Sequence, residues 1–183
     1  MHSKRSDSPT ETWREKCGVF GVYAPGEDVS RITFYGIYAL QHRGQESAGI
    51  ATADGFGIHL HSGMGLVSQV FEENDLGYLP GHAAIGHTRY STTGSSILCN
   101  AQPLFSASRY GPIAVAHNGN LVNGDDLRRE LEADGAIFNT MSDTEVIVHL
   151  IARSKANGLE AALIDALGRV RGEIGRASCR ERV

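Results

Sequence analysis

The chain has 183 residues, of which 41% are hydrophobic, and it carries a formal net charge of -4. This length supports one substantial core and favours a single domain. Residues 17–172 hold 10 basic and 16 acidic side chains, which excludes the dense positive charge of a nucleic-acid-binding surface. The 22 glycines favour a strand-rich mixed fold with many tight turns over a helical bundle.

Targeting and redox signals are absent from the sequence. No stretch approaches the roughly 18 consecutive apolar residues of a membrane span, and residues 1–16 lack the apolar middle region of a secretory signal. The three cysteines, Cys17, Cys99 and Cys179, form no spaced framework of the kind found in disulfide-stapled secreted domains. We therefore expect a cytoplasmic protein with no membrane or nucleic-acid partner.

The two ends of the chain differ from its middle. Residues 1–16 are polar, show no hydrophobic period and meet an apolar run abruptly at Cys17, so we interpret them as a disordered or removable leader. Residues 173–183 also lack a period, and common codons back-translate this run to a sequence that resembles a sequencing adapter read in frame. We hypothesise that 173–183 is a non-native tail and that the domain over 17–172 is incomplete at its C-terminal end.

The first half of the middle region predicts mainly strands. Residues 17–23 have the branched and aromatic content of a buried strand, and a helix is predicted over 29–40, with Asp28 as its cap. Residues 47–53 and 56–61 predict a hairpin around Asp54-Gly55, a favoured two-residue turn. Further strands are predicted over 83–88 and 113–117.

Helices follow in the second half, over 125–133, 143–153 and 159–170. The second of these opens with Ser142 and Glu145 at the spacing of a capping box, in which the two side chains satisfy free amides reciprocally. Strands followed by helices favour antiparallel sheets faced by helices, an α+β architecture.

Cys17 is the first candidate for chemistry. A cysteine that opens a buried strand is usually a small apolar filler. If the bond after Lys16 were cleaved, however, Cys17 would carry a thiol and a free α-amine, whose unperturbed pKa of about 8 lies near neutrality. One residue would then supply both nucleophile and base, as in N-terminal threonine enzymes.

Asn118 and Gly119 follow the apolar run of the strand predicted over 113–117. An Asn-Gly pair often forms only a turn. In a functional interpretation it is an oxyanion hole, because the Asn118 amide is a donor and Gly119 exposes its backbone N–H without a Cβ in the way.

Three further residues suggest a grip on an amino acid. Arg89 at a strand end is either a solvated charge or a bidentate ligand for a carboxylate, with Thr92 as an additional polar contact. Asp143 in a first helical turn is favoured by the helix dipole, and its alternative role is to hold an ammonium group. A site that binds both a carboxylate and an ammonium group suits an α-amino acid.

Cofactor signals are weak in this sequence. His59 and His61 share one strand face, and His87 and His117 are candidates to approach each other, but no zinc-ligand spacing is present. Gly63-Met64-Gly65 lacks the rest of a phosphate-binding loop. We expect no metal and no cofactor in this chain.

Six strings taken together closely resemble the amidophosphoribosyltransferase family: CGVFG, QHRGQESAGI, GHTRYSTTG, NAQPL, HNGNLVN and SDTE, in this order between residues 17 and 145. The resemblance covers nearly all of 17–172. It implies an N-terminal-nucleophile hydrolase fold, a four-layer αββα sandwich of antiparallel sheets.

The resemblance also implies an activity, the hydrolysis of glutamine to glutamate and ammonia. Cys17 would attack the side-chain amide, and Asn118 with Gly119 would bind the oxyanion. The other implied roles are glutamine binding by Arg89 at the α-carboxylate, by Asp143 at the α-ammonium and by Thr92, and support of the loop near Cys17 by Arg43.

In this family the ammonia passes to a C-terminal phosphoribosyltransferase domain, which binds phosphoribosyl pyrophosphate with Mg²⁺ and makes 5-phosphoribosylamine in purine biosynthesis. That domain is missing from this sequence. Leader-bearing members often carry a 4Fe-4S cluster, whose ligands lie mostly beyond this chain, and the full-length protein is expected to be a homo-oligomer.

Three alternatives remain open. The chain could be the glutaminase domain of another amidotransferase, such as glucosamine-phosphate synthase or glutamate synthase, although those lineages use different strings. It could be an N-terminal-nucleophile amide hydrolase without a synthetic partner, or a catalytically silent fragment.

Overall fold

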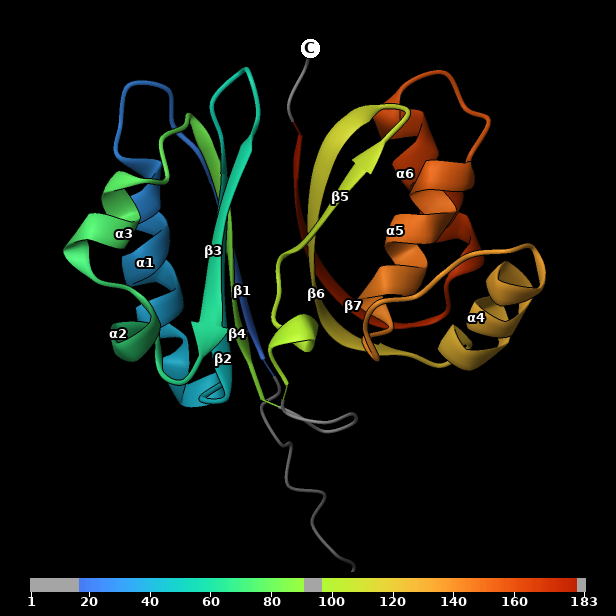
Figure 1. Cartoon of the computed structure of the whole chain (residues 1–183), viewed down its shortest axis with the longest axis horizontal. Helices are drawn as coiled ribbons and strands as arrows, with labels where there is room; N and C mark the ends of the chain where they lie inside the picture. Colours follow the sequence, from blue (N-terminus) through green and yellow to red (C-terminus); the bar gives the residue numbers. More distant parts are fainter. Residues whose placement is uncertain (1–16, 91–96, 181–183) are drawn as a thin grey trace, which may run out of the picture.

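The computed structural model describes residues 17–90 and 97–180, with the backbone alone for 173–180. Its elements form four layers, in which two sheets face each other and helices cover the outer face of each sheet (Figure 1). This arrangement confirms the predicted α+β sandwich of antiparallel sheets.

The first sheet has four antiparallel strands in the order β1-β4-β2-β3. Its strands are β1 (Gly18–Tyr23), β2 (Ser47–Ala53), β3 (Ile58–Met64) and β4 (Ala83–Arg89). The helices on its outer face are α1 (Val29–Ala39), α2 (Val67–Val70) and α3 (Glu73–Gly77), and the 3-10 helix η1 (Gln41–Arg43) follows α1.

The second sheet has three antiparallel strands in the order β5-β6-β7. They are β5 (Leu104–Ser108), β6 (Gly111–Leu121) and β7 (Gly172–Arg180). The helices beside this sheet are α4 (Gly124–Ala133), α5 (Thr144–Arg153) and α6 (Leu159–Arg169), and a second 3-10 helix, η2 (Leu98–Asn100), precedes β5.

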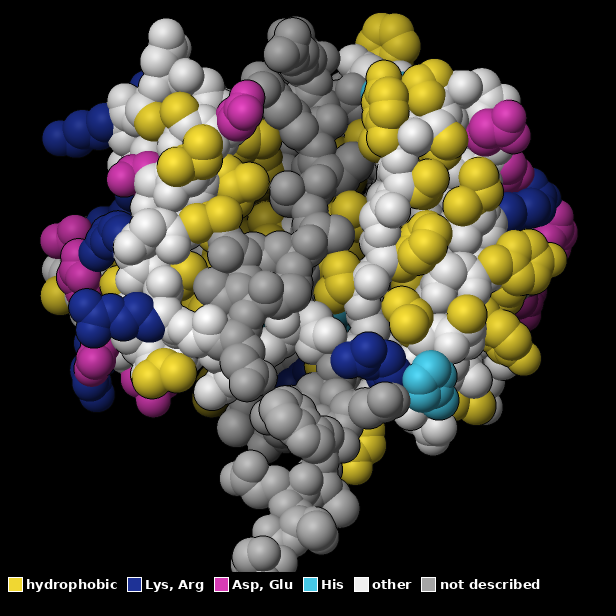
Figure 2. Space-filling model, turned by 180° about the vertical axis from the view of Figure 1, so that it is seen from behind, with side chains coloured by type: hydrophobic (Ala, Val, Ile, Leu, Met, Phe, Trp, Pro, Cys, Tyr) yellow, Lys and Arg dark blue, Asp and Glu magenta, His cyan; other side chains and the backbone are white. Residues whose placement is uncertain are grey.

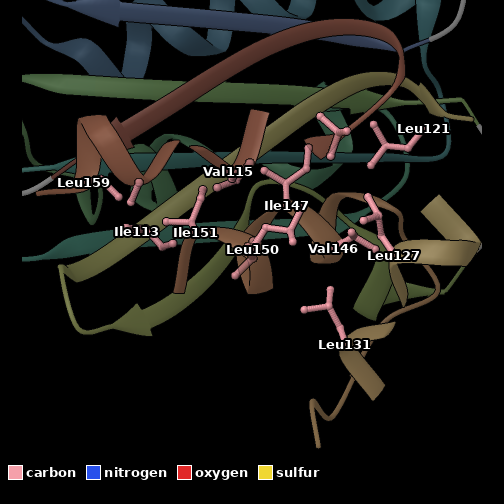
Figure 3. Close-up of a cluster of buried hydrophobic side chains, with 14 residues drawn as sticks. Ile113, Val115, Leu121, Leu127, Leu131, Val146, Ile147, Leu150, Ile151 and Leu159 are labelled. Atoms are coloured by element: carbon pink, nitrogen blue, oxygen red, sulfur yellow. The ribbon is translucent and has the colours of Figure 1, made fainter. Parts of the chain in front are cut away.

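Three apolar clusters hold the layers together. The largest lies between the second sheet and helices α4–α6, and Figure 3 shows Ile147, Ile151 and Leu150 of α5 pointing toward Ile113 and Val115 of β6. The cluster between the two sheets is made mostly of small side chains: Ala51, Ala53, Ile85, Ala114 and Ala116. Small side chains allow two pleated sheets to approach closely.

On the face that Figure 2 shows, most of the basic and acidic side chains lie toward the two outer sides, and many hydrophobic side chains lie further inward. Within the described ranges, no helix combines the length and the apolar character needed to cross a bilayer.

Seven predicted elements are confirmed to within one residue at each end. The strand predicted over 47–53 is β2, and the helices predicted over 125–133, 143–153 and 159–170 are α4, α5 and α6. The strand at 17–23 is β1, and the helix at 29–40 is α1, where the Asp28 side chain accepts the Arg31 N–H over 3.1 Å. The strand at 83–88 is β4 with one more residue.

The predicted two-residue hairpin turn is wrong. The Asp54 Oδ1 accepts the N–H groups of Phe56 and Gly57, both over 2.8 Å. Phe56 and Gly57 therefore belong to a turn built on the Asp54 side chain, and β3 begins at Ile58 instead of at position 56.

The predicted capping box at the start of α5 is also wrong. Glu145 does not bond back to Ser142; its carboxylate instead accepts the N–H groups of Asn139 over 2.8 Å and Thr140 over 2.7 Å. The spacing of a capping box is therefore present, but the buried carboxylate is used to fasten the loop before the helix.

Strand β6 is longer than the prediction over 113–117. It continues through Asn118 and Gly119 to Leu121, so the Asn-Gly pair lies inside a strand and forms no turn. Gly119 has φ +138, a backbone conformation that favours glycine.

Strand β7 pairs with β6 along its whole length, from Gly172 opposite Leu121 to Arg180 opposite Ile113. No strand was predicted here, because residues 173–183 show no hydrophobic period. The pairing uses backbone groups, so it leaves the hypothesis of a non-native tail untested.

Candidate active site

A cavity of about 320 Å³ lies where the end of β4 and the residue before β1 meet β6 and the loop before α5. Cys17, Arg89, Gly119 and Asp143, which were singled out in the sequence, all line it. The antiparallel register that pairs Gly18 with Thr88 explains why Cys17 and Arg89 are neighbours. Four predicted residues from four distant parts of the chain therefore face one cavity.

The Cys17 sulfur contacts the backbone just beyond β4. The N–H of Tyr90 donates to Sγ over 3.4 Å, and the thiol lies 3.6 Å from the Tyr90 carbonyl oxygen. Cys17 has φ +46, a left-handed conformation that is rare and strained for a residue with a side chain. The thiol is thus held at the cavity by a strained backbone position.

Burial raises the pKa of the Cys17 thiol above its ordinary value, although the Tyr90 N–H and the positive charge of Arg89 act in the opposite direction. The negative charges of Glu46 and Asp143 add to the increase. A thiol in this environment is protonated at neutral pH and needs a base before it can attack.

Asn118 contacts the backbone of Cys17. Its side-chain Nδ2 donates to the Cys17 carbonyl oxygen over 3.0 Å, which joins β6 to the segment before β1. A side-chain amide nitrogen carries two N–H donors, so this bond orients the group and uses only one of them. Gly119 lines the cavity next to it.

Arg89 is the last residue of β4 and is only 8% exposed. A buried guanidinium in a cavity wall does not fit a solvated surface charge. It does fit a group that binds a carboxylate with two parallel hydrogen bonds.

Asp143 faces the cavity from the residue before α5. Its Oδ2 accepts the Leu121 N–H over 2.8 Å, and its Oδ1 lies 3.6 Å from Nδ1 of His117. Burial acts to raise the pKa of Asp143, but the nearby His117 side chain and the hydrogen bond from the Leu121 N–H outweigh it and hold the pKa below its ordinary value. Asp143 is therefore an anion at neutral pH.

The four histidines weighed as metal ligands have other contacts. His87 lies close to His117, and burial lowers the pKa of His87 to about 3, so it is neutral. His59 contacts Asp54 over 2.6 Å, and His61 lies 2.9 Å from the Val70 carbonyl oxygen. Among the residues that the structure describes, no three groups of metal-ligand type come together.

Three predicted residues do not line the cavity. Asn118 is bonded to Cys17 but is not in the cavity wall, and Thr92 lies outside the described residues. Arg43 ends η1, and its Nε is buried and has no hydrogen-bond partner among the residues that the structure describes. Its supporting role stays a prediction.

The sequence reasoning missed several residues that line the cavity, among them Tyr90, Gln102 and Met141. Tyr90 reaches the Cys17 sulfur through its backbone, which leaves no side-chain signal in a sequence. Gln102 belongs to the string NAQPL, which was noticed but received no role. Met141 is an exposed apolar residue in a loop, and no pattern marks it.

The chemistry that this cavity offers can be stated from its charges. One nucleophilic thiol shares a space of about 320 Å³ with one cation, Arg89, and two carboxylates, Asp143 and Asp125. The opposite charges suit the carboxylate and the ammonium of an α-amino acid. Gly119 lines the cavity, and the Asn118 amide, which is not itself in the cavity wall, bonds to the backbone of Cys17, which is.

The known proteins that resemble this chain support the same chemical interpretation. Residues 87–181 match the family described as glutamine amidotransferase domain. The amidophosphoribosyltransferase of Synechococcus elongatus is 54% identical over 155 residues, which are 85% of this chain and 31% of that protein. Amidophosphoribosyltransferase 2, chloroplastic, of Arabidopsis thaliana is 51% identical over 168 residues, which are 91% of this chain and 30% of that protein.

Solved structures agree with these relatives. Glutamine phosphoribosylpyrophosphate amidotransferase from B. subtilis, complexed with ADP and GMP, matches with a TM-score of 0.81 and 43% identity, over 88% of this chain and 34% of that chain. A structure of the allosteric regulatory enzyme of purine biosynthesis matches with a TM-score of 0.83 and 44% identity, over 88% of this chain and 35% of that chain.

The chain spans about a third of the length of these proteins. The family match itself covers more than half of the chain and includes Arg89, Asn118, Gly119 and Asp143. This protein belongs to the glutamine amidotransferase domain family.

Proposed function

We propose that the chain is the glutamine-hydrolysing domain of an amidophosphoribosyltransferase, and that it converts glutamine and water to glutamate and ammonia. The observation that carries the proposal is the shared cavity, in which the Cys17 thiol faces the Arg89 guanidinium and the Asp143 carboxylate. The names of the relatives supply the substrate, because an amidotransferase takes nitrogen from glutamine.

In the proposed reaction the Cys17 sulfur attacks the side-chain carbonyl carbon of glutamine. The negative oxygen that forms accepts hydrogen bonds from the second Nδ2–H of Asn118 and from the Gly119 N–H. The C–N bond then breaks, and ammonia leaves with the proton that came from the thiol. Water hydrolyses the resulting γ-glutamyl thioester, which releases glutamate and restores the thiol.

The proton transfers in this scheme need a base, and the proposal assigns this role to the α-amine of Cys17 after removal of residues 1–16. The thiol needs such a base because burial raises its pKa. The strain at Cys17 supports the same step, since the left-handed φ of +46 is costly only while a preceding carbonyl is attached. Cleavage after Lys16 would release this strain.

The activity of the whole protein is also a proposal. A C-terminal domain outside this chain would use the ammonia and phosphoribosyl pyrophosphate, with Mg²⁺, to make 5-phosphoribosylamine. A homo-oligomer and a 4Fe-4S cluster in that domain are part of the same proposal and rest on the resemblance of the six strings. A cytoplasmic location is also proposed, and it rests on the sequence of residues 1–16 and the lack of a long apolar stretch.

The test is incubation of the purified chain with glutamine, followed by measurement of both products. We expect ammonia and glutamate in equal amounts from the wild-type chain and neither product from Cys17→Ala. Asparagine, which is shorter by one methylene, is the matched control substrate. Release of ammonia without glutamate, or equal rates for wild type and Cys17→Ala, would contradict the proposal.

A further inference from the structure

The string NAQPL begins with two buried side chains that the proposed reaction does not use. Asn100 is 0% exposed and ends η2, and Gln102 is 6% exposed and precedes β5. In Figure 1 this segment is the short yellow-green turn at the centre of the molecule, between the two sheets. Its position suggests a role for the two side chains at the site.

Gln102 bonds to the strand that carries the oxyanion donors. Its Oε1 accepts the backbone N–H of His117 over 2.7 Å, directly before Asn118 and Gly119. The register of β5 with β6 pairs Leu104 with Val115, so the side chain of Gln102 continues the ladder beyond the strand end. This bond fixes β6 directly before Asn118, which contacts Cys17, and Gly119, which lines the cavity.

Asn100 bonds to the loop before Asp143, the residue proposed to bind the ammonium group. Its Oδ1 accepts the backbone N–H of Met141 over 2.8 Å, two residues before Asp143. Met141 and Asp143 both line the cavity. Asn100 thus fixes the loop that leads to Asp143.

The segment is itself held against the first sheet. A Cβ added to Gly49 in β2 would lie 2.2 Å from the carbonyl oxygen of Gln102, so the two backbones are in close contact. Only glycine permits this approach. The segment therefore connects the first sheet to both parts of the site that belong to the other half of the molecule.

We propose that Asn100 and Gln102 are positioning residues with separate tasks. Gln102 aligns the proposed oxyanion donors through the His117 N–H. Asn100 aligns Asp143, the proposed ligand of the ammonium group, through the Met141 N–H. This inference rests on the proposed glutaminase function. It predicts that the Gln102 side chain affects mainly kcat and the Asn100 side chain mainly KM. Loss of an oxyanion donor's alignment lowers kcat, whereas loss of a ground-state substrate contact raises KM.

The test compares two near-isosteric variants that lack the accepting oxygen, in the full 183-residue chain. Gln102→Met should lower kcat roughly 10- to 100-fold with KM for glutamine nearly unchanged, because a displacement of about 1 Å at a reacting centre costs that much. Asn100→Leu should raise KM roughly tenfold with kcat nearly unchanged. Asn100→Asp keeps an accepting oxygen and should restore most of the affinity.

Gln69→Met is the matched control. The Gln69 Oε1 also accepts a backbone N–H, that of Leu66 over 2.9 Å, but it lies on α2 and does not line the cavity. This variant should leave kcat and KM unchanged. If Gln102→Met does not fold, Gln102→Asn, which keeps the amide but shortens its reach by one methylene, replaces it.

Amide hydrogen exchange separates failure of this inference from failure of the proposed function. Gln102→Met should speed exchange of the His117 N–H, and Asn100→Leu should speed exchange of the Met141 N–H, whether or not the chain hydrolyses glutamine. An active wild-type chain whose two variants change kcat and KM alike would overturn the separate tasks. Unchanged exchange at both amides would overturn the positioning itself, and an inactive wild-type chain would contradict only the glutaminase proposal.

Discussion

The side-chain amide of Asn118 has one N–H bound to the Cys17 carbonyl oxygen and a second that the proposed oxyanion would use. Replacement by alanine removes this donor while the Gly119 N–H remains. We expect Asn118→Ala to lower kcat by roughly 10² to 10³, the usual loss for one oxyanion donor, with little change in KM. Steady-state kinetics with glutamine measure both values, and an increase in KM alone would make Asn118 a substrate contact.

Arg89 and Asp143 can be tested with truncated substrates. Glutaramate lacks the α-ammonium of glutamine, and 4-aminobutanamide carries its amine without the α-carboxylate. Asp143→Asn should lower kcat/KM for glutamine roughly 10- to 100-fold, as expected for the loss of a charge-assisted contact, yet leave the rate with glutaramate nearly unchanged.

Arg89→Lys is the reciprocal variant, because lysine keeps the charge but loses the two-pronged geometry. It should lower kcat/KM for glutamine and for glutaramate, and leave 4-aminobutanamide nearly unchanged. If each variant lowers activity toward all three amides equally, the assignment of the two grips is wrong.

The expected pH dependence of activity follows from two titrating groups, the Asp143 carboxylate and the Cys17 α-amine. The nearby His117 side chain and the hydrogen bond from the Leu121 N–H hold the pKa of Asp143 below its ordinary value. The carboxylate therefore stays ionised above about pH 4, and its binding of the ammonium group does not change at higher pH. The α-amine of Cys17 must be neutral to accept the thiol proton, and its neutral fraction increases through about pH 8.

We therefore expect kcat/KM to increase from about pH 6 to about pH 8.5, with KM for glutamine nearly constant. Initial rates over this range measure both. A KM that increases steeply toward low pH would show that the Asp143 carboxylate titrates in this range, contrary to the sign of its pKa shift.

Among the residues of the site, those with a distinctive side chain could be predicted, whereas those that act through the backbone could not. Cys17, Arg89 and Asp143 were singled out because a thiol, a guanidinium and a carboxylate have chemistry that a sequence displays, and the structure places them around one cavity. Tyr90 contacts the sulfur through its N–H, and any residue type could do this.

At the scale of elements, a local sequence signal predicted the structure correctly where the side chain binds the backbone of its own helix. The cap at Asp28 fixed the start of α1, because its carboxylate satisfies a free N–H of the first turn. The start of α5 has the same kind of signal, but there Glu145 is used for a tertiary contact. Sequence spacing cannot distinguish the two uses, because they need the same residue types.

Strand β6 was predicted too short for a related reason. Asn-Gly is a strong turn signal, yet here the pair continues the strand and is paired with β7. The gain from a ladder of backbone hydrogen bonds and a buried apolar face outweighs the local preference for a turn. Strand β5 was not predicted at all, since its alternation is short and partly exposed.

Glu145 provides the test at this scale. Its buried carboxylate accepts two backbone N–H groups of the loop before α5, and removal of the carboxylate leaves both without a partner. We expect Glu145→Ala to lower the free energy of unfolding by about 2 to 3 kcal/mol, as for hydrogen bonds to a charged group. Glu145→Gln keeps one accepting oxygen and should lose less.

Denaturant unfolding measures these differences. The control is Glu130→Ala, which removes an exposed ion pair with Arg169 and should cost less than about 1 kcal/mol. Equal losses in Glu145→Ala and Glu130→Ala would show that the loop is not fastened by this carboxylate.

At the scale of the whole molecule, the resemblance of six strings gave the four-layer architecture, which periodicity alone could not. Strand periodicity gives no information on how two sheets face each other, because this depends on contacts between residues far apart in sequence. The small side chains between the sheets, such as Ala51 and Ala116, show the physical basis of the close approach.

The nature of residues 173–183 is a second question at this scale, and it stays a prediction. Strand β7 pairs with β6 through backbone groups, and a ladder of this kind tolerates foreign side chains. Resequencing of the gene decides the matter. A different sequence after Gly172 is expected, and a genomic continuation of EIGRASCRERV would end the hypothesis.

The central claim is that Cys17 acts as the first residue of a processed chain, with thiol and amine on one residue. Intact mass measurement of the glutamine-hydrolysing fraction tests it most directly. We predict that the active chain has lost residues 1–16 and that Cys17→Ala retains them. A chain that keeps Met1 and hydrolyses glutamine as fast as the shortened chain would contradict the account.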